Sequence, residues 1–333
     1  MGRPGARNLI TDVAGLSVGN VADGTLRSGV TVLVMDSPAT ASVAVLGGAP
    51  GTRETDLLSP ENTVSAVDAL VLSGGSAFGL DAASGVQAFL REKGRGFEVA
   101  GFCVPIVPAA ILFDLANGGD KEWGRYPPYR DFGYEAAAGA SADFAIGSVG
   151  AGTGATTATV KGGLGSASLV LESGVTVGAL VAVNAVGAPL VGGTRHFWAA
   201  PFEIDDEFGG LGHPSPFPAD ASSPRTKLGA RAGANTTIAI VATDAVLDKA
   251  ACERLDIASH DVFARALWPA HTNYDGDLVF GVATGGSGIV PSPQQAIEIG
   301  AAAASVMARA IARGTYAATS AAGDRMPAWR ELR

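Results

Sequence analysis

The segment Asn235-Thr236-Thr237-Ile238-Ala239-Ile240-Val241-Ala242 carries the sharpest change of pattern in the chain. The stretch before it, residues 200–233, holds several prolines and acidic residues and shows no sustained hydrophobic period. A structureless segment of that length inside a compact domain is uncommon unless it is functional or a linker. The β-branched and small apolar residues that end the segment predict a buried strand. We therefore expect Thr236 at the rigid N-terminal edge of a strand, directly after the small residues Gly233 and Ala234.

This placement suits an autocatalytic nucleophile. The peptide before such a nucleophile must be strained or freely positioned, whereas its hydroxyl must stay fixed. The tripeptide Asn235-Thr236-Thr237 alone is also a glycosylation sequon or the plain start of a strand, so it decides little by itself. The combination of a long loop, small residues and a strand makes Thr236 a candidate nucleophile.

The composition describes a folded, acidic protein. The chain has 333 residues, 47% of them hydrophobic, and 23 Lys and Arg against 32 Asp and Glu, a net charge of −9. This hydrophobicity and the low charged fraction exclude a disordered chain. We expect no nucleic-acid partner, because an acidic chain lacks the basic stripe that neutralises phosphates.

Short Val- and Ile-rich runs separated by glycine predict buried strands. They are Thr31–Met35, Ser42–Leu46, Ala69–Leu72, Ser168–Leu171, Val175–Val183, Thr237–Ala242 and Leu278–Val282. One helix is expected from Ser76, as its N-cap, to Gly94. A second begins with the capping box Ser292-Pro293-Gln294-Gln295 and runs to Gly314, and a third is expected within residues 246–267. Alanine-rich helices pack closely, so helices layered over sheets are expected.

Three further stretches bear on organisation. Residues 117–139, like residues 200–233, show no sustained period and are expected to be irregular. The charge-free stretch Ser173–Thr194 is long enough to span a membrane, but its glycines, Pro189 and alternating valines favour two buried strands around a turn. No apolar run follows the charged N-terminus before Asp12, so no signal peptide is indicated. We expect no membrane partner and a cytoplasmic protein.

Two glycine-rich motifs resemble nucleotide or nucleophile sites without meeting their requirements. Residues 150–155 fit the GxGxxG/A dinucleotide pattern, but β-branched residues follow in place of the required helix. Residues 72–78 form a predicted strand–turn–helix like a nucleophile elbow, but Phe78 stands where the final glycine belongs. We expect no nucleotide cofactor.

No metal site is expected either. Residues 273–277 resemble the start of a calcium loop, but Leu278 replaces its turn glycine. The cysteines, Cys103 and Cys252, have no CxxC spacing. The four histidines are scattered, without an HExxH motif or an i, i+4 pair.

Six segments, spread in order over nearly the whole chain, carry a resemblance to a known family. They are residues 9–19, 72–80, 150–155, Val183-Asn184, Asn235-Thr236-Thr237 and Asp275-Gly276-Asp277. Together they resemble the self-cleaving N-terminal-nucleophile amidohydrolases of peptidase family S58. That family contains the D-aminopeptidase DmpA, the β-peptidyl aminopeptidases and the nylon-oligomer hydrolase NylC.

The resemblance implies a single hydrolase domain, residues 1–333, with an α/β (α+β) fold. This fold is a four-layer αββα sandwich of two β-sheets covered by helices, of the DmpA/ArgJ-like kind. The precursor would be cut between Asn235 and Thr236 into an α subunit, residues 1–235, and a β subunit, residues 236–333. The resemblance also implies a homotetramer of processed α/β units, a small-molecule amide or peptide as substrate, and no cofactor.

The resemblance also assigns roles. Thr236 matches the nucleophile, Asn184 and Lys161 match groups around the reacting carbonyl, and Asp275 and Asp277 match an acidic pair. A freed Thr236 amine has an ordinary pKa near ~8, so it takes the hydroxyl proton without a histidine. Asp277 would hold that amine, Asp275 would orient Asp277, and Asn184 would donate to the oxyanion. Two close carboxylates repel, so one of their pKa values should be raised.

Two departures from the family bear on substrate. Phe113 stands where characterised relatives carry a tyrosine near the oxyanion, and Ile111 stands where the aminopeptidase branch carries an amine-binding glutamate. An apolar wall of Ile111 and Phe113 favours neutral aliphatic amides, nylon (6-aminohexanoate) oligomers among them. The alternatives are an aminopeptidase of the DmpA or β-peptidyl type, an acyltransferase that uses an amine acceptor, and a non-catalytic scaffold.

Overall fold

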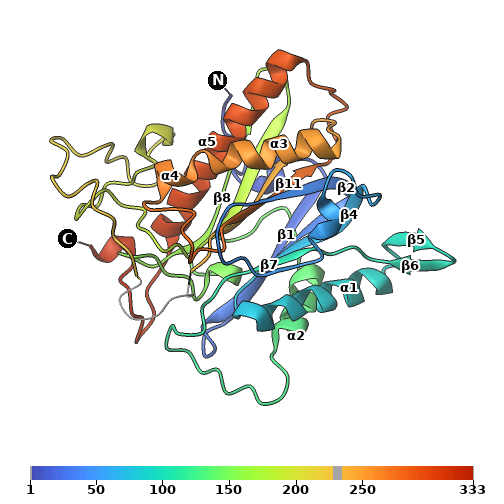
Figure 1. The fold of residues 1–333 in the computed structure, drawn as a ribbon, viewed down its shortest axis with the longest axis horizontal. Coiled ribbons are helices and arrows are strands. Elements are labelled where there is room, and N and C mark those ends of the chain that lie inside the picture. Colours follow the sequence, from blue (N-terminus) through green and yellow to red (C-terminus); the bar gives the residue numbers. More distant parts are fainter. Residues whose placement is uncertain (1, 228–234, 333) are drawn as a thin grey trace.

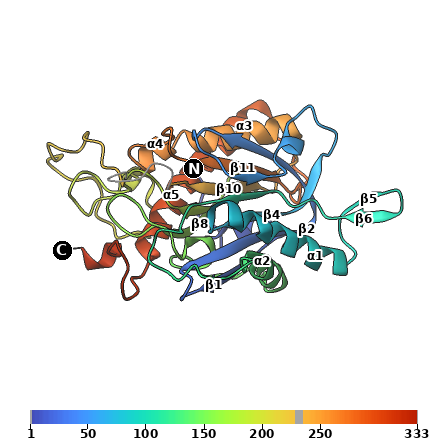
Figure 2. The ribbon, with the colours of Figure 1, turned by 60° about the horizontal axis from the view of Figure 1, so that its bottom comes forward.

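The computed structural model describes residues 2–227 and 235–332. Among these residues, nine strands form one hydrogen-bonded sheet in the order β3-β7-β4-β2-β11-β10-β9-β8, with β1 pairing beside β2 (Figure 1). The strands are β1 (Leu16–Asp23), β2 (Ser28–Val45), β3 (Thr52–Arg53), β4 (Ala66–Ser73), β7 (Ala109–Ile111), β8 (Gly163–Val170), β9 (Thr176–Val183), β10 (Ile238–Thr243) and β11 (Leu278–Ala283). A separate hairpin, β5 (Phe97–Val99) and β6 (Phe102–Val104), projects from the body (Figure 2).

Five α-helices cover this sheet. They are α1 (Ala82–Glu92), α2 (Tyr129–Ala138), α3 (Lys249–His260), α4 (Phe263–Ala266) and α5 (Pro293–Ala317). Short 3-10 turns lie at η1 (Ile10–Asp12), η2 (Asp56–Leu58), η3 (Ser76–Asp81), η4 (Gly150–Gly152), η5 (Ala200–Phe202) and η6 (Trp329–Glu331). No helix in the described part of the chain is long and apolar enough to cross a membrane.

Strand β2 belongs to two layers at once. Its first half, residues 28–35, pairs with β1 and β4, whereas its last six residues, 40–45, pair with β11. The register between β2 and β4 shifts between Val34 and Ala39, where the strand passes from one layer to the other. The two sheets expected from the family resemblance are therefore two layers of one continuous sheet.

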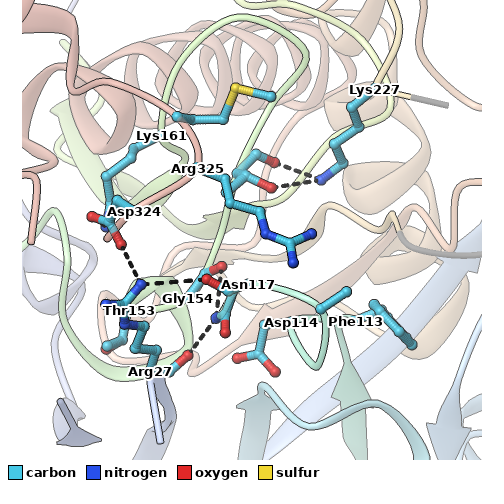
Figure 3. Close-up of a pocket in the computed structure, with 13 residues that line it drawn as sticks. Arg27, Phe113, Asp114, Asn117, Thr153, Gly154, Lys161, Lys227, Asp324 and Arg325 are labelled. Atoms are coloured by element: carbon cyan, nitrogen blue, oxygen red, sulfur yellow. Dashed lines mark hydrogen bonds and ion pairs between the residues drawn. The ribbon is translucent and has the colours of Figure 1, made fainter. Parts of the chain in front are cut away.

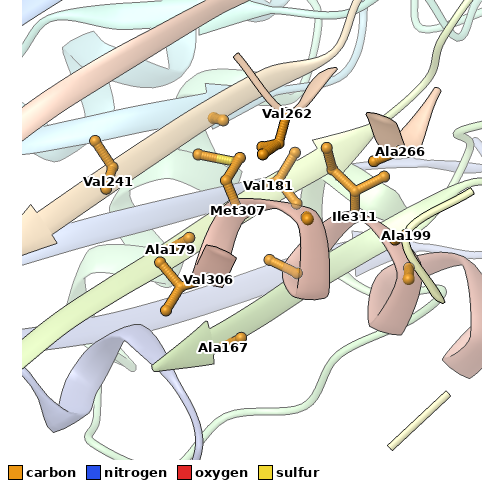
Figure 4. Close-up of a cluster of buried hydrophobic side chains, with 14 of the residues drawn as sticks. Ala167, Ala179, Val181, Ala199, Val241, Val262, Ala266, Val306, Met307 and Ile311 are labelled. Atoms are coloured by element: carbon orange, nitrogen blue, oxygen red, sulfur yellow. The ribbon is translucent and has the colours of Figure 1, made fainter. Parts of the chain in front are cut away.

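Three buried clusters separate the layers. Val181 of β9 and Val241 of β10 pack with Ile311 of α5 in the first cluster (Figure 4). The alternate residues of the same strands turn the other way, so Leu180 and Ile240 share the second cluster with Leu33 of β2. In a third cluster, other residues of β2 and β4 meet α1 and α2. The order is helix, sheet, sheet, helix, which confirms the predicted αββα sandwich.

Glycine permits the closest contacts between layers. A Cβ placed on Gly165 of β8 would lie 1.9 Å from the carbonyl oxygen of Ala310 in α5, and Gly314 of α5 faces the backbone of Gly165. This contact explains why α5 continues through Gly314 to Ala317 instead of ending at that glycine as expected. Its start agrees with the prediction, because the Ser292 hydroxyl accepts from the Gln295 amide.

The helix expected after Ser76 starts later and with a different cap. Ser76 opens the 3-10 turn η3 with φ of +53°, after Gly75, and the α-helix begins only at Ala82. Ser76 is therefore not a helix N-cap. In the third expected helical region, residues 246–267, two helices form, α3 and α4.

Two stretches differ from the sequence-based expectation. Helix α2 lies within residues 117–139, which were expected to be irregular; its buried side includes Gly133, Ala136 and Ala137, residues too small to reveal a hydrophobic period. In the stretch Ser173–Thr194, only β9 is a strand, and Ala188 and Leu190 form isolated bridges with Trp268 and Phe197. The expected strands Val175–Val183, Thr237–Ala242 and Leu278–Val282 are present to within one residue at each end. Strands β4 and β8 begin three and five residues before the expected Ala69–Leu72 and Ser168–Leu171, and the expected Thr31–Met35 and Ser42–Leu46 both belong to β2.

Candidate active site

Thr236 lies two residues before β10, between the end of β9 and the turn that leads into β11. Its residue is 3% exposed, and its amide N donates to the Asn184 carbonyl oxygen at 3.0 Å. A Cβ on Gly276 would lie 2.7 Å from Thr236 Oγ1, so the 275–277 turn closes over the hydroxyl. Three neighbouring strands thus fix one hydroxyl, as the sequence predicted for the N-terminal edge of a strand.

The carbonyl before Thr236 is held from two sides. Thr236 Oγ1 donates to the Asn235 carbonyl oxygen, and the Gly276 amide N donates to the same oxygen at 3.2 Å. Asn235 pairs with Asp275 in a parallel bridge and is 2% exposed. Neither its Nδ2 nor its Oδ1 has a partner among the described residues. The hydroxyl therefore lies beside the carbonyl that it would attack, and a backbone N–H already polarises that carbonyl.

The amide of Asn184 has a defined orientation. Its Oδ1 accepts from the Thr156 amide N and from Lys227 Nζ, each at 3.0 Å. Its Nδ2 donates to the Phe113 carbonyl oxygen at 3.1 Å. Because an amide nitrogen has two N–H groups, one remains to donate to a further oxygen.

Lys227 is a site residue that sequence reasoning did not identify. Its ammonium lies against four oxygens, which are Thr156 O at 2.7 Å, Thr156 Oγ1 at 3.2 Å, Asn184 Oδ1 at 3.0 Å and Asn184 O at 3.1 Å. Burial lowers the pKa of Lys227 to about 7, although the carboxylates of Asp275 and Asp277 oppose that shift. The only sequence signal was a lysine inside a proline-rich loop, which is usually solvated.

Asp275 is buried and held by the backbone of neighbouring segments. Its Oδ1 accepts from the Val186 amide N at 3.0 Å, and its Oδ2 accepts from Thr272 N at 3.1 Å and Thr272 Oγ1 at 2.7 Å. Burial, and then the charge of Asp277, raise the pKa of Asp275 above its ordinary value. The expectation that one carboxylate of the pair has a raised pKa agrees with this environment.

Asp277 faces Thr237 and His271. Its Oδ1 accepts from the Thr237 amide N at 2.8 Å, and its Oδ2 accepts from the amide N and the Nδ1 of His271 at 3.0 and 2.9 Å. No hydrogen bond joins the two aspartates in the part of the chain that the structure describes. Asp277 is thus oriented by His271 and Thr237, where the sequence analysis expected Asp275 to orient it.

Two of the scattered histidines meet behind Asp277. His260, at the end of α3, holds the Ala44 carbonyl oxygen with Nε2 at 3.0 Å, and its Nδ1 lies 3.2 Å from His271 Nε2. The carbonyl only accepts, so His260 Nε2 carries a proton. Burial lowers the pKa of His260 to about 4, so its ring is neutral and its Nδ1 accepts.

His271 connects His260 to Asp277. Its Nε2 lies 3.2 Å from His260 Nδ1, and its Nδ1 lies 2.9 Å from Asp277 Oδ2. The ring of His271 thus links the end of α3 to the acidic pair. Sequence reasoning missed this pair because the histidines lie eleven residues apart, in a helix and a loop.

Two of the remaining predicted residues, Lys161 and Phe113, line a neighbouring cavity of about 170 Å³ (Figure 3). Ile111 is buried in β7 beside Gly51 and is not among the lining residues. Lys161 Nζ pairs with Asp324 Oδ2 at 2.6 Å. The structure therefore brings together Thr236, Asn184, Asp275 and Asp277, whereas Lys161 pairs with Asp324 and Ile111 packs against Gly51.

Nucleotide and metal sites find no support in this geometry. Of residues 150–155, the first three form the 3-10 turn η4, and the chain then leads through the isolated bridge of Thr156 with Lys161 into β8, with no α-helix in between. Within residues 2–227 and 235–332, no three His, Cys, Asp or Glu side chains gather in a way that would hold a metal ion.

Comparison with known proteins gives consistent matches. The sequence model of peptidase family S58 matches residues 8–327. The protein named uncharacterized aminopeptidase Rv1333, of Mycobacterium tuberculosis (strain ATCC 25618 / H37Rv), is 44% identical over 344 residues, covering 98% of each chain. The 6-aminohexanoate-oligomer endohydrolase of Kocuria sp. (strain KY2) is 28% identical over 295 residues, covering 84% of this chain and 76% of that protein.

A solved structure gives the same result for the fold. The L-aminopeptidase D-Ala-esterase/amidase of Ochrobactrum anthropi, described as a variant of the Ntn hydrolase fold, superposes with a TM-score of 0.71. The two chains are 20% identical, and the match covers 98% of this chain and 91% of that one. The chain therefore has the fold of these N-terminal-nucleophile hydrolases.

Proposed function

Because the chain belongs to peptidase family S58, we propose that it is an autocatalytically processed hydrolase of amide bonds with Thr236 as its nucleophile. The observation that carries the proposal is the contact between Thr236 Oγ1 and the Asn235 carbonyl, with the Gly276 N–H on the same oxygen. Self-cleavage needs an attacking hydroxyl beside the carbonyl and a donor for the developing oxyanion. Both are in place at this bond.

The processing reaction is an acyl shift followed by hydrolysis. Thr236 Oγ attacks the Asn235 carbonyl carbon, the C–N bond breaks, and the hydroxyl proton passes to the leaving nitrogen. The product is an ester between Asn235 and Thr236 Oγ, which water converts into an Asn235 carboxylate and a free Thr236 hydroxyl and amine. The oxyanion of the first step is stabilised by the Gly276 N–H at 3.2 Å.

The freed amine then serves as the base for substrate cleavage. An α-amine has a pKa near ~8, so it accepts the Thr236 hydroxyl proton at working pH and returns it to the leaving amine. The Asn184 carbonyl oxygen, 3.0 Å from the Thr236 nitrogen, is an acceptor that fixes the direction of this amine. The unused N–H of Asn184 Nδ2 is the donor that we assign to the substrate oxyanion.

The substrates that we propose are small or oligomeric linear amides and peptides, 6-aminohexanoate oligomers among them. One relative, 28% identical, is named an endohydrolase of such oligomers, whereas relatives at 44% identity are named aminopeptidases. Aminopeptidase action is thus the second candidate.

Intact mass of the purified protein tests the proposal directly. We expect two fragments that divide between Asn235 and Thr236, and we expect Thr236→Ala to stay whole and to lose amide hydrolysis. Thr237→Ala, which removes the neighbouring hydroxyl, is the matched control and should be cut. A continuous chain that still splits amides would overturn Thr236 as the nucleophile, and turnover that requires an added amine would indicate acyl transfer.

A further inference from the structure

The cavity beside the candidate active site is rich in charge. Its lining includes four basic side chains and two acidic ones, namely Arg27, Lys161, Lys227, Arg325, Asp114 and Asp324 (Figure 3). The cavity adjoins the reacting residues, because Thr156 and Lys227 line it and both also hydrogen-bond to Asn184. A substrate bound to Thr236 and Asn184 therefore has this cavity next to it.

Three of the four basic groups already have partners. Lys161 pairs with Asp324 at 2.6 Å, and Arg27 reaches the same carboxylate at 3.4 Å and donates to the carbonyl oxygens of Gly323 and Ala322. Lys227 is enclosed by oxygens of Thr156 and Asn184. Each of these three cations therefore already has a partner within the protein.

The two acids are engaged as well. Burial by itself would raise the pKa of Asp324, but hydrogen bonds from Lys161 and the Ala321 amide, together with the charges of Lys161 and Arg27, outweigh it and hold that pKa below its ordinary value. Asp114 accepts from Ser28 Oγ at 2.6 Å and from the Gly75 amide N at 2.8 Å. Neither acid is free to receive a substrate ammonium group.

Arg325 differs from the other cations. Its side chain extends into the middle of the cavity (Figure 3), and it has no hydrogen bond or ion pair with any residue of the described chain. An arginine guanidinium has five N–H donors in a planar fork that fits the two oxygens of a carboxylate. Among the described residues, the lining thus has more basic than acidic side chains, and Arg325 is a group without a hydrogen-bond or ion-pair partner there whose shape fits a planar anion.

We propose that this cavity binds a carboxylate carried by the substrate, with Arg325 as its direct partner. The proposal deepens the proposed function, on which it rests, by naming the substrate class: amides or peptides that bear a free C-terminal carboxylate. It differs from the expectation of a neutral aliphatic substrate, which relied on a wall of Ile111 and Phe113. Only Phe113 of those two lines the cavity.

Hydrolysis of matched substrates provides the first test. A linear 6-aminohexanoate trimer with a free carboxylate is compared with the same trimer ending in a primary carboxamide, and Ala-Ala is compared with Ala-Ala-amide. We expect the wild type to prefer the acid by about 5-fold in KM, with similar kcat, which is the upper range for an ion pair at an exposed guanidinium. Arg325→Gln should abolish the preference, and Arg325→Lys should keep part of it.

The control variant is Arg330→Gln. Arg330 lies in the same C-terminal segment, over the ring of Tyr316 and outside the lining of the cavity, so its loss changes net charge equally. If Arg330→Gln reduces the preference as much as Arg325→Gln does, the effect is a general field and the proposal is wrong. Equal cleavage of acid and amide by the wild type would also overturn it.

Direct binding separates this proposal from the proposed function. Calorimetric titration with N-acetylglycine, and with N-acetylglycinamide as the neutral match, should show Arg325-dependent binding of the acid alone. This result would support the carboxylate site even if no amide were cleaved. The alternative occupant of the cavity is the carboxylate that processing would create at Asn235. If N-acetylglycine binds to uncut Thr236→Ala but not to the processed protein, the cavity holds the Asn235 carboxylate. This result would overturn the substrate claim.

Discussion

Exchange of His271 for Asn or Gly tests whether its imidazole ring positions Asp277. His271 has φ of +54°, a conformation that Gly and Asn adopt with little strain, so neither variant adds a backbone cost that would obscure the result. Asn places its Nδ2 where the imidazole has Nδ1 and keeps a neutral donor toward Asp277. Gly removes the donor but retains the backbone N–H, which lies 3.0 Å from Asp277 Oδ2.

The size of the effect follows from the bond that is lost. His271 Nδ1 lies 2.9 Å from Asp277 Oδ2, and the side chain of Asp277 is 1% exposed. A hydrogen bond to a charged group contributes about 1.5–3 kcal/mol, against about 0.5–1.5 kcal/mol for a neutral one. His271→Gly should therefore lower the rate of self-cleavage by about 10- to 150-fold, and His271→Asn should recover roughly a tenth or more of the wild-type rate.

The rate is measured by pulse-labelled cell-free synthesis, with the two fragments followed over time on a gel. The free energy of urea unfolding, measured on uncut Thr236→Ala carrying the same changes, shows how much of the loss is structural. The positioning role is refuted if His271→Gly is processed at the wild-type rate. Equal losses in His271→Gly and His271→Asn would show that the donor to Asp277 is not what the ring supplies.

Three further predictions concern stability. The pKa of His260 is lowered from 6.5 to about 4, so between these pH values the unfolded state binds more protons than the folded state. The free energy of unfolding should therefore fall as the pH drops from 6.5 to 4. His260→Gln should reduce this fall, as measured by urea unfolding at a series of pH values. Burial raises the pKa of Asp256 to about 8, so the folded state holds a proton that the unfolded state has released. The free energy of unfolding should therefore fall as the pH rises toward 8, and Asp256→Asn should remove this fall. An unchanged dependence of the unfolding free energy on pH in Asp256→Asn would contradict the prediction. Gly165→Ala places a Cβ 1.9 Å from the Ala310 carbonyl oxygen and should lower the melting temperature, whereas Gly300→Ala, with its nearest neighbour at 3.6 Å, should leave it unchanged or raise it.

Local signals in the sequence located most of the fold. The capping box at Ser292 fixes the start of α5 with two hydrogen bonds between residues three apart, and such short-range chemistry is readable without a structure. Helix α2 left no comparable signal, because its buried face includes Gly133, Ala136 and Ala137. These residues pack closely because they are small, and they do not produce a pattern of large apolar side chains. The crossing of β2 between layers was also hidden, since two apolar runs with polar residues between them look like two strands.

Some residues of the candidate site could be located from the sequence, and others could not. Thr236 and Asp277 stand next to the buried strands β10 and β11, so their positions followed from the strand pattern and the family resemblance. Lys227 and His271 owe their places to contacts that close only when the chain folds, with Asn184 forty-three residues before Lys227 and with the end of α3. No spacing in the sequence encodes such contacts. From the sequence alone, Lys227 is a lysine in one loop and His271 a histidine in another.

The order of strands has a consequence for the two chains that the proposed cleavage would produce. A cut before Thr236 leaves β10 and β11 on the shorter product, and these two strands lie side by side in the middle of the sheet. On one flank β10 is hydrogen-bonded to β9, and on the other β11 is hydrogen-bonded to β2, both from the longer product. The shorter chain would therefore stay bound on both sides by strand pairing with the longer chain. Cleavage would create a new chain end without separating the two chains.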